Sequence, residues 1–137
     1  MKITMLTRRS IFLISAAFLS GAGSAALAAP RHNPVRMFDT DNDGTLDLAE
    51  VKKAATALFT KLDRDHEGTL DRRELGGRLS ARELAAADPD HDGTLTLDEY
   101  LGVVEQRFHA ADADGDGTLD AKELNSRAGR ALLRFLR

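Results

Sequence analysis

The chain of 137 residues has no cysteine and no tryptophan, and it contains only six phenylalanines and one tyrosine. The absence of cysteine excludes disulfide bonds, with which small proteins of oxidising compartments commonly stabilise themselves. So few aromatic side chains predict a thin core that needs another source of stability. The length is that of one domain or of two very small lobes.

The sequence also lacks the common signatures of catalytic and nucleic-acid-binding sites. It has no Gly-x-Ser-x-Gly, no phosphate-binding P-loop, no His-Glu-x-x-His and no cysteine nucleophile. No basic stripe is interleaved with aromatic residues, and the formal net charge is −3. We therefore expect neither an enzyme nor a protein that binds nucleic acid.

The first 28 residues have the composition of a cleavable export signal. Three cations precede a short apolar run at residues 11–19, and Ala26-Leu27-Ala28 offers a small-x-small cleavage site. We expect cleavage after Ala28, which leaves a mature domain of residues 29–137 in the periplasm or outside the cell.

Two alternatives concern this segment. Residues 7–13 (TRRSIFL) resemble a twin-arginine (Tat) export signal, and an ordinary Sec signal fits almost as well. An uncleaved membrane anchor is less consistent with residues 11–29, because glycines and serines dilute the apolar run and a spanning helix needs about 20 strongly apolar residues.

A twelve-residue pattern occurs four times, in the first loop (39–50), the second (63–74), the third (88–99) and the fourth (112–123). The fourth copy, DADGDGTLDAKE, has carboxylates at places one, three, five, nine and twelve. Calcium takes six to eight oxygen ligands at about 2.3–2.6 Å. A tight loop can direct that many inward only if the chain turns sharply halfway, and Gly117 permits the turn because it has no Cβ. The repeat therefore predicts up to four Ca²⁺ sites.

We expect the ligands at places one, three, five, seven, nine and twelve of each loop. Place seven would supply a backbone carbonyl, and the glutamate at place twelve would supply two oxygens. The predicted metal ligands are Asp39, Asp41, Asp43, Thr45, Asp47 and Glu50; Asp63, Asp65, Glu67, Thr69, Asp71 and Glu74; Asp88, Asp90, Asp92, Thr94, Thr96 and Glu99; and Asp112, Asp114, Asp116, Thr118, Asp120 and Glu123.

All four loops are expected to bind calcium, with unequal strength. Glu67 at place five is one methylene longer than aspartate, so the second site is predicted to be the weakest. The third loop has Thr96 at place nine, where water often bridges to the ion, and Pro89 at place two, which should pre-order the loop by fixing φ. A bidentate glutamate at place twelve favours calcium over magnesium. His66 and His91 are expected to face solvent.

These loops resemble those of EF-hand calcium-binding proteins, and the resemblance covers residues 34 to about 136. The close spacing resembles small exported bacterial members more than calmodulin. The resemblance implies an all-α EF-hand array whose leucines at place eight form short strand contacts. The sequence departs from the calmodulin pattern at residues 51–62 and 100–111, where only twelve residues separate two loops. Each interval has room for one helix, which two loops must share.

The middle interval differs from the other two. Leu75, Gly76 and Gly77 should break the helix that leaves the second loop, and the pattern from Ser80 to Glu83 predicts a capping box that starts a new short helix. The chain can reverse there. The second loop could then pair with the third, and the first loop with the fourth.

Residues 122–137 are predicted to form one final helix, in which Gly129 costs about 1 kcal/mol. The arginines on its outer side are interpreted as a solvated face rather than a contact for anionic lipid or a protein partner. They are Arg127, Arg130, Arg134 and Arg137.

Two functions agree with these features. One is an exported calcium buffer or calcium-stabilised binding scaffold. The other is a sensor that binds an unidentified protein partner when calcium exposes a methionine-rich groove. The mature chain would retain only Met37. The sequence therefore favours the buffer or scaffold.

Overall fold

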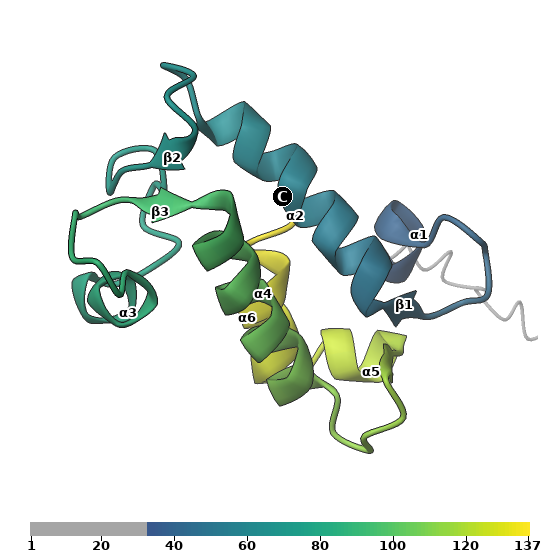
Figure 1. Ribbon diagram of the computed structural model, residues 1–137. Coiled ribbons are helices and arrows are strands. Elements are labelled where there is room, and N and C mark those ends of the chain that lie inside the picture. Colours follow the sequence, from purple (N-terminus) through teal and green to yellow (C-terminus); the bar gives the residue numbers. More distant parts are fainter. Residues whose placement is uncertain (1–32) are drawn as a thin grey trace, which may run out of the picture.

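The computed structural model describes residues 33–137 (Figure 1). The expected export signal and its cleavage site lie outside this range. Within it, no helix has both the length and the apolar character that crossing a membrane requires.

The described chain is mainly helical, with four strands of two residues each. Its elements are α1 (Val35–Phe38), β1 (Leu46–Asp47), α2 (Leu48–Leu62), β2 (Thr69–Leu70), α3 (Ala81–Ala87), β3 (Leu95–Thr96), α4 (Leu97–Ala111), β4 (Thr118–Leu119), α5 (Ala121–Leu124) and α6 (Arg127–Leu133).

A single helix joins the first loop to the second, and another joins the third to the fourth, as the short intervals predict. Each of these helices, α2 and α4, has 15 residues and begins directly after a strand. Each ends at the first aspartate of the next loop. The N–H groups of Asp63 and Asp112 donate to the carbonyls of Phe59 and Phe108, both at 2.9 Å. The two helices pack against each other (Figure 1).

The chain reverses in the middle interval, where the expected helix after the second loop is absent and residues 72–77 form turns instead. Gly76 and Gly77 have φ values of 55° and 76°, in the left-handed region that favours glycine. Helix α3 then starts with the predicted capping box, in which Ser80 Oγ accepts the Glu83 N–H and Glu83 Oε2 accepts the Ser80 N–H. This reversal brings the two loop–helix–loop halves together.

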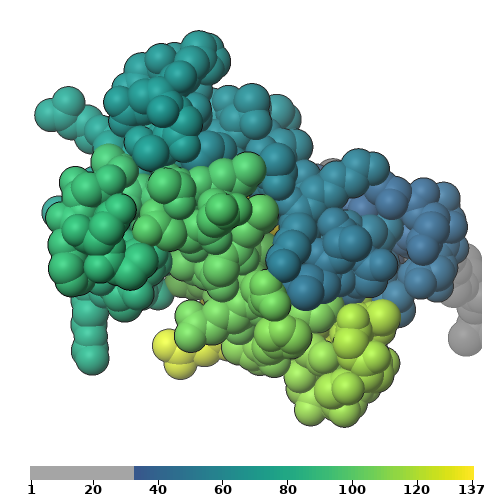
Figure 2. Space-filling model, in the orientation of Figure 1, coloured from purple at the N-terminus to yellow at the C-terminus, as the bar shows by residue number. Residues whose placement is uncertain are grey.

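Loop pairing follows the expected order, in two antiparallel two-stranded sheets. Strand β1 pairs with β4, which places Leu46 opposite Leu119, and β2 pairs with β3, which places Leu70 opposite Leu95. All four leucines are fully buried. The sheets lie at opposite ends of the molecule in Figure 1, and Figure 2 shows the blue surface of the first loop beside the yellow-green surface around α5.

The prediction of one final helix over residues 122–137 is wrong. Helix α5 ends at Leu124, and α6 begins after Ser126, whose hydroxyl accepts the Gly129 N–H at 3.0 Å. A Cβ at Gly129 would overlap the carbonyl oxygen of Glu123 and the backbone of Leu124. Gly129 therefore lets α6 fold back closely over α5, a role that its helix propensity does not indicate.

Helix α6 and the residues after it cover the apolar side of α4. Tyr100 lies between the rings of Phe59 and Phe135, with centroids 5.6 and 5.4 Å away, and its hydroxyl donates to the Phe135 carbonyl. The Arg107 guanidinium lies 4.6 Å from the centre of the Phe135 ring and donates to the Ala131 carbonyl. Burial raises the pKa of Tyr100 to about 12.

Candidate metal centres

The glycine at place six gives each loop its sharp turn. These four glycines have φ values between 85° and 91°. Each donates its N–H to Oδ2 of the aspartate at place one, over 2.9 to 3.1 Å. The pairs are Gly44 with Asp39, Gly68 with Asp63, Gly93 with Asp88, and Gly117 with Asp112. The turn that the sequence predicts is therefore present in all four loops.

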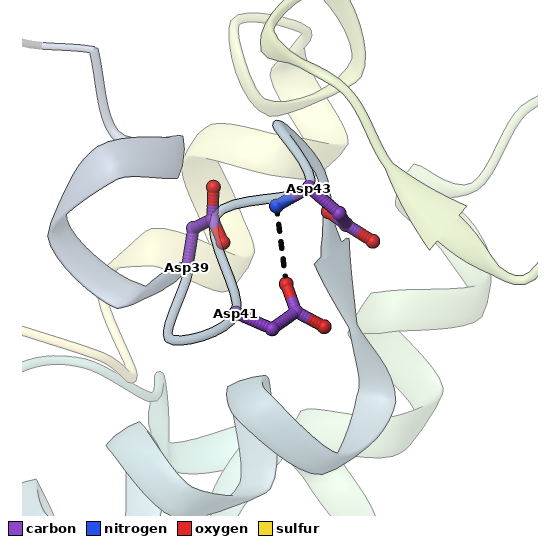
Figure 3. A group of neighbouring side chains, drawn as sticks. All are labelled: Asp39, Asp41 and Asp43. Carbon is purple, nitrogen blue, oxygen red and sulfur yellow. Dashed lines mark hydrogen bonds between the residues drawn. The ribbon is translucent and has the colours of Figure 1, made fainter.

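Each loop gathers three carboxylates whose oxygens lie within 4.8 Å of one another. In the last three loops they come from places one, three and twelve; in the first loop they come from places one, three and five (Figure 3). The groups are Asp39, Asp41 and Asp43; Asp63, Asp65 and Glu74; Asp88, Asp90 and Glu99; and Asp112, Asp114 and Glu123. Glu50 lies outside the first group, and the acids at place five lie outside the other three.

Acids at place five turn toward the threonine at place seven. Asp43 accepts both the N–H and the hydroxyl of Thr45 at 2.8 Å, and the third and fourth loops repeat this contact. The hydrogen bond from the Thr45 N–H lowers the pKa of Asp43. Glu67 accepts only the Thr69 hydroxyl, at 2.9 Å. The longer Glu67 side chain thus makes only one of the two contacts with the threonine at place seven that the other loops make. Weaker calcium binding by the second loop stays a prediction.

The glutamate at place twelve is held by backbone N–H groups across the loop. In three loops its Oε1 accepts the N–H of place two, as Glu74 does from Arg64 and Glu123 does from Ala113, both at 2.9 Å. Glu50 accepts the N–H of Thr40 in the same way. Burial raises the pKa of Glu50, but the hydrogen bonds that Glu50 accepts, chiefly those from Thr40, together outweigh burial and the net shift is downward.

The third loop lacks this contact. Pro89 at place two has no N–H, so Glu99 is held only from place nine, by the N–H and hydroxyl of Thr96 at 2.8 Å. Proline therefore removes a donor as well as fixing φ. The sequence contained this information, since the loss follows from the residue type alone.

Side chains at place nine cap the helices that leave the first, third and fourth loops, and Asp71 of the second loop makes the same contact at the start of a turn. Asp47, Asp71 and Asp120 accept the N–H of the glutamate three residues later at 2.7–2.8 Å, and Thr96 does so at 3.3 Å. The three aspartates lie outside the four carboxylate groups, and calcium ligation from place nine stays a prediction. The spacing of Asp or Thr and Glu at this point is that of a capping box, so the sequence carried the signal.

The groups fit a hard cation such as calcium. Asp63 is 8% exposed, and its Oδ1 is buried without a hydrogen-bond partner among the described residues. A buried carboxylate oxygen without a partner is costly unless a cation compensates its charge. A side-chain hydrogen bond with Asp88 raises the pKa of Asp90, as expected when two carboxyl groups share one small site. All of these donors are oxygens, the ligands that calcium prefers.

Threonines at place seven start or immediately precede the strands. Their carbonyl ligation stays a prediction. His66 and His91 are exposed at φ values of 60° and 58°, and neither belongs to a potential metal-binding group of the described residues.

Two family models match the chain. The one described as an EF-hand domain pair matches residues 35–105, and the one described as an EF hand matches residues 103–126. The first range contains the first three loops and the second contains the fourth. No curated protein matches the sequence.

Proposed function

The chain belongs to the EF-hand family and binds calcium, and we propose that it is an exported calcium buffer or calcium-stabilised scaffold rather than a sensor. Its ligands would be the oxygens at places one, three, five, seven, nine and twelve of the four loops. The mature domain would comprise residues 29–137. We expect no catalytic activity.

The observation that carries this proposal is the cover that α6 provides. A sensor must offer an apolar groove to its partner when calcium is bound. Here Leu132, Leu133, Phe135 and Leu136 are buried against the rest of the core. Among the large hydrophobic side chains of the described range, only Met37 is mostly exposed, at 53%. A surface of this kind suits a protein that binds calcium without exposing a partner site.

The carboxylate groups give calcium a direct role in stability. Two carboxylates about 4 Å apart repel each other by roughly 4 kcal/mol at an effective dielectric constant of 20. Calcium at 100 times its dissociation constant adds about 2.7 kcal/mol per site. Without cysteine, the domain has no disulfide bond to replace that contribution. We therefore expect the folded state to depend on calcium.

Support for export comes from the composition of residues 1–28, with their cations, apolar run and small-residue site. Closely spaced loops are also a feature that the chain shares with small exported bacterial EF-hand proteins. Outside the cytoplasm, calcium is commonly plentiful enough to keep tight sites filled.

Calcium titration of residues 29–137 tests the proposal by calorimetry, far-UV circular dichroism and the fluorescence of a dye that binds apolar surface. A buffer or scaffold gains helix on calcium binding without binding more dye. Micromolar affinity together with increased dye binding would instead support the sensor. Asp98→Asn is a suitable control, because Asp98 is an exposed acid at place eleven, outside the predicted ligands.

A further inference from the structure

We propose that the four calcium sites are coupled in a closed ring. In this ring, loss of one site weakens the two sites beside it and affects the opposite site least. The fourth site is thereby coupled to the first, although they are the most distant in sequence. The inference rests on the proposed calcium binding and deepens it by stating how the sites regulate one another.

Two links of the ring are helices. Glu50, at place twelve of the first loop, lies in the first turn of α2, and Asp63, at place one of the second loop, is the C-cap of the same helix. Helix α4 joins Glu99 to Asp112 in the same way. No flexible linker separates these residues, because each helix is continuous over 15 residues. A movement of the glutamate on calcium binding therefore displaces the first aspartate of the next loop.

The other two links are the strand pairs. Strands β1 and β4 join the first loop to the fourth, and β2 and β3 join the second to the third. Each pair joins places seven and eight of one loop to places eight and nine of the other, so it contains a predicted ligand at place seven and a helix cap at place nine. The paired leucines are fully buried, so the two backbones cannot slip past each other without exposing apolar surface. A movement of one loop when it binds calcium is thus transmitted to the loop with which its strand pairs.

Packing between the helices completes the ring. Helices α2 and α4 are in contact, and Lys52 Nζ on α2 lies 2.7 Å from Glu105 Oε2 on α4. Strand pairs alone would leave two independent pairs of sites, the first with the fourth and the second with the third. The continuous helices join these pairs. Each site therefore has two directly linked neighbours and one opposite site.

The amide groups of the glycines at place six can report each site separately. Gly44, Gly68, Gly93 and Gly117 each donate to the first aspartate of their own loop, so a calcium ion held there changes the chemical shift of that amide. Titration of the full-length chain with calcium, followed by amide nitrogen–proton NMR spectra, gives one midpoint per loop. In the unmodified chain, the ring predicts cooperative filling with a Hill coefficient above 1.

Removal of the fourth site provides the decisive variant. In Glu123→Gln, we expect the midpoints at Gly44 and Gly93 to rise about tenfold, within the usual range of coupling between sites. The midpoint at Gly68, in the opposite loop, should rise less than about threefold. Asp98→Asn removes the same charge outside the predicted ligands and should leave all four midpoints unchanged.

Glu50→Gln tests the same link from the other side. Because coupling is reciprocal, it should raise the Gly117 midpoint by the factor by which Glu123→Gln raises that of Gly44. An unchanged Gly44 midpoint in Glu123→Gln, unequal factors in the reciprocal pair, or an equal rise in all three remaining loops would overturn the ring. Independent filling of four sites would overturn the ring alone, whereas no glycine shift in the unmodified chain would overturn the proposed function as well.

Discussion

The first half of the molecule (39–74) and the second (88–123) repeat the same loop–helix–loop unit, yet they differ in what covers them. Helices α2 and α4 have equal lengths, begin with capping boxes and end at an aspartate. Only a four-residue helix, α1, precedes the first half, whereas α6 folds back over the second half and the residues after it supply Phe135 to the core. The repeated residues thus determine the loops, and the residues outside the repeat determine how the core is closed.

The strongest test of this difference is Phe135→Ala. Phe135 is fully buried against Tyr100, so the cavity should lower the free energy of unfolding by about 3–5 kcal/mol. Phe38→Ala, at the half-buried edge of the first half, should cost less than about half as much. Urea denaturation in saturating calcium measures both. Equal losses would show that the two halves contribute equally to the core.

A pair of glycine substitutions tests how α6 is attached. Gly129→Ala forces the backbones of α5 and α6 apart and should destabilise by about 3 kcal/mol, at the upper end of overpacking effects. Gly102→Ala makes the same chemical change in α4, where a Cβ meets nothing within 4 Å, and should stabilise by about 0.5–1 kcal/mol. Thermal unfolding measures the change in stability of each variant and shows whether the two changes have opposite signs. Stabilisation by both substitutions would contradict the close approach of α6.

Tyr100, the chain's one tyrosine, lies in the second half and gives that half a pH dependence. Burial raises its pKa from 10.0 to about 12, so the folded state keeps a proton that the unfolded state loses above pH 10. Stability is therefore unaffected below pH 10 and falls by roughly 2–3 kcal/mol between pH 10 and 12.

Ultraviolet difference spectra of the tyrosinate and unfolding at each pH measure this loss. Tyr100→Phe should remove the decrease attributable to this group, at a cost of about 1 kcal/mol for the hydrogen bond to the Phe135 carbonyl. An unchanged pH profile in Tyr100→Phe would refute the assignment.

The smallest effect concerns place two of the middle loops. Pro89→Ala restores an N–H that can donate to Glu99, but it also loosens the empty loop. We expect a gain in the third site's calcium affinity of about threefold, or under 1 kcal/mol. Arg64→Pro removes the matching bond to Glu74 and should weaken the second site by a similar factor. The Gly93 and Gly68 amide shifts report the two midpoints, and changes of the same sign would reject this explanation.

Much of the candidate site follows from neighbouring residues in the chain. The glycine at place six, the shared helices α2 and α4 and the capping box at Ser80 depend on local conformation and spacing, and the structure has each where the sequence predicts it. The side chains at place nine carry two local signals at once. Asp47 has the residue type of a ligand and the spacing of a cap, and the structure places it on the helix N-terminus.

By itself, the sequence determined four calcium loops, their two shared helices and the reversal between the halves, because turns, caps and helical periodicity act over a few residues. Only the tertiary structure decided that residues 122–137 form two helices and that Gly129 lies against Glu123. It also decided which carboxylates gather in each loop. The reason is physical. Helix propensity alone counts a glycine in a helical segment as destabilising, whereas Gly129 is needed here because the backbone of Glu123 and Leu124 packs against it.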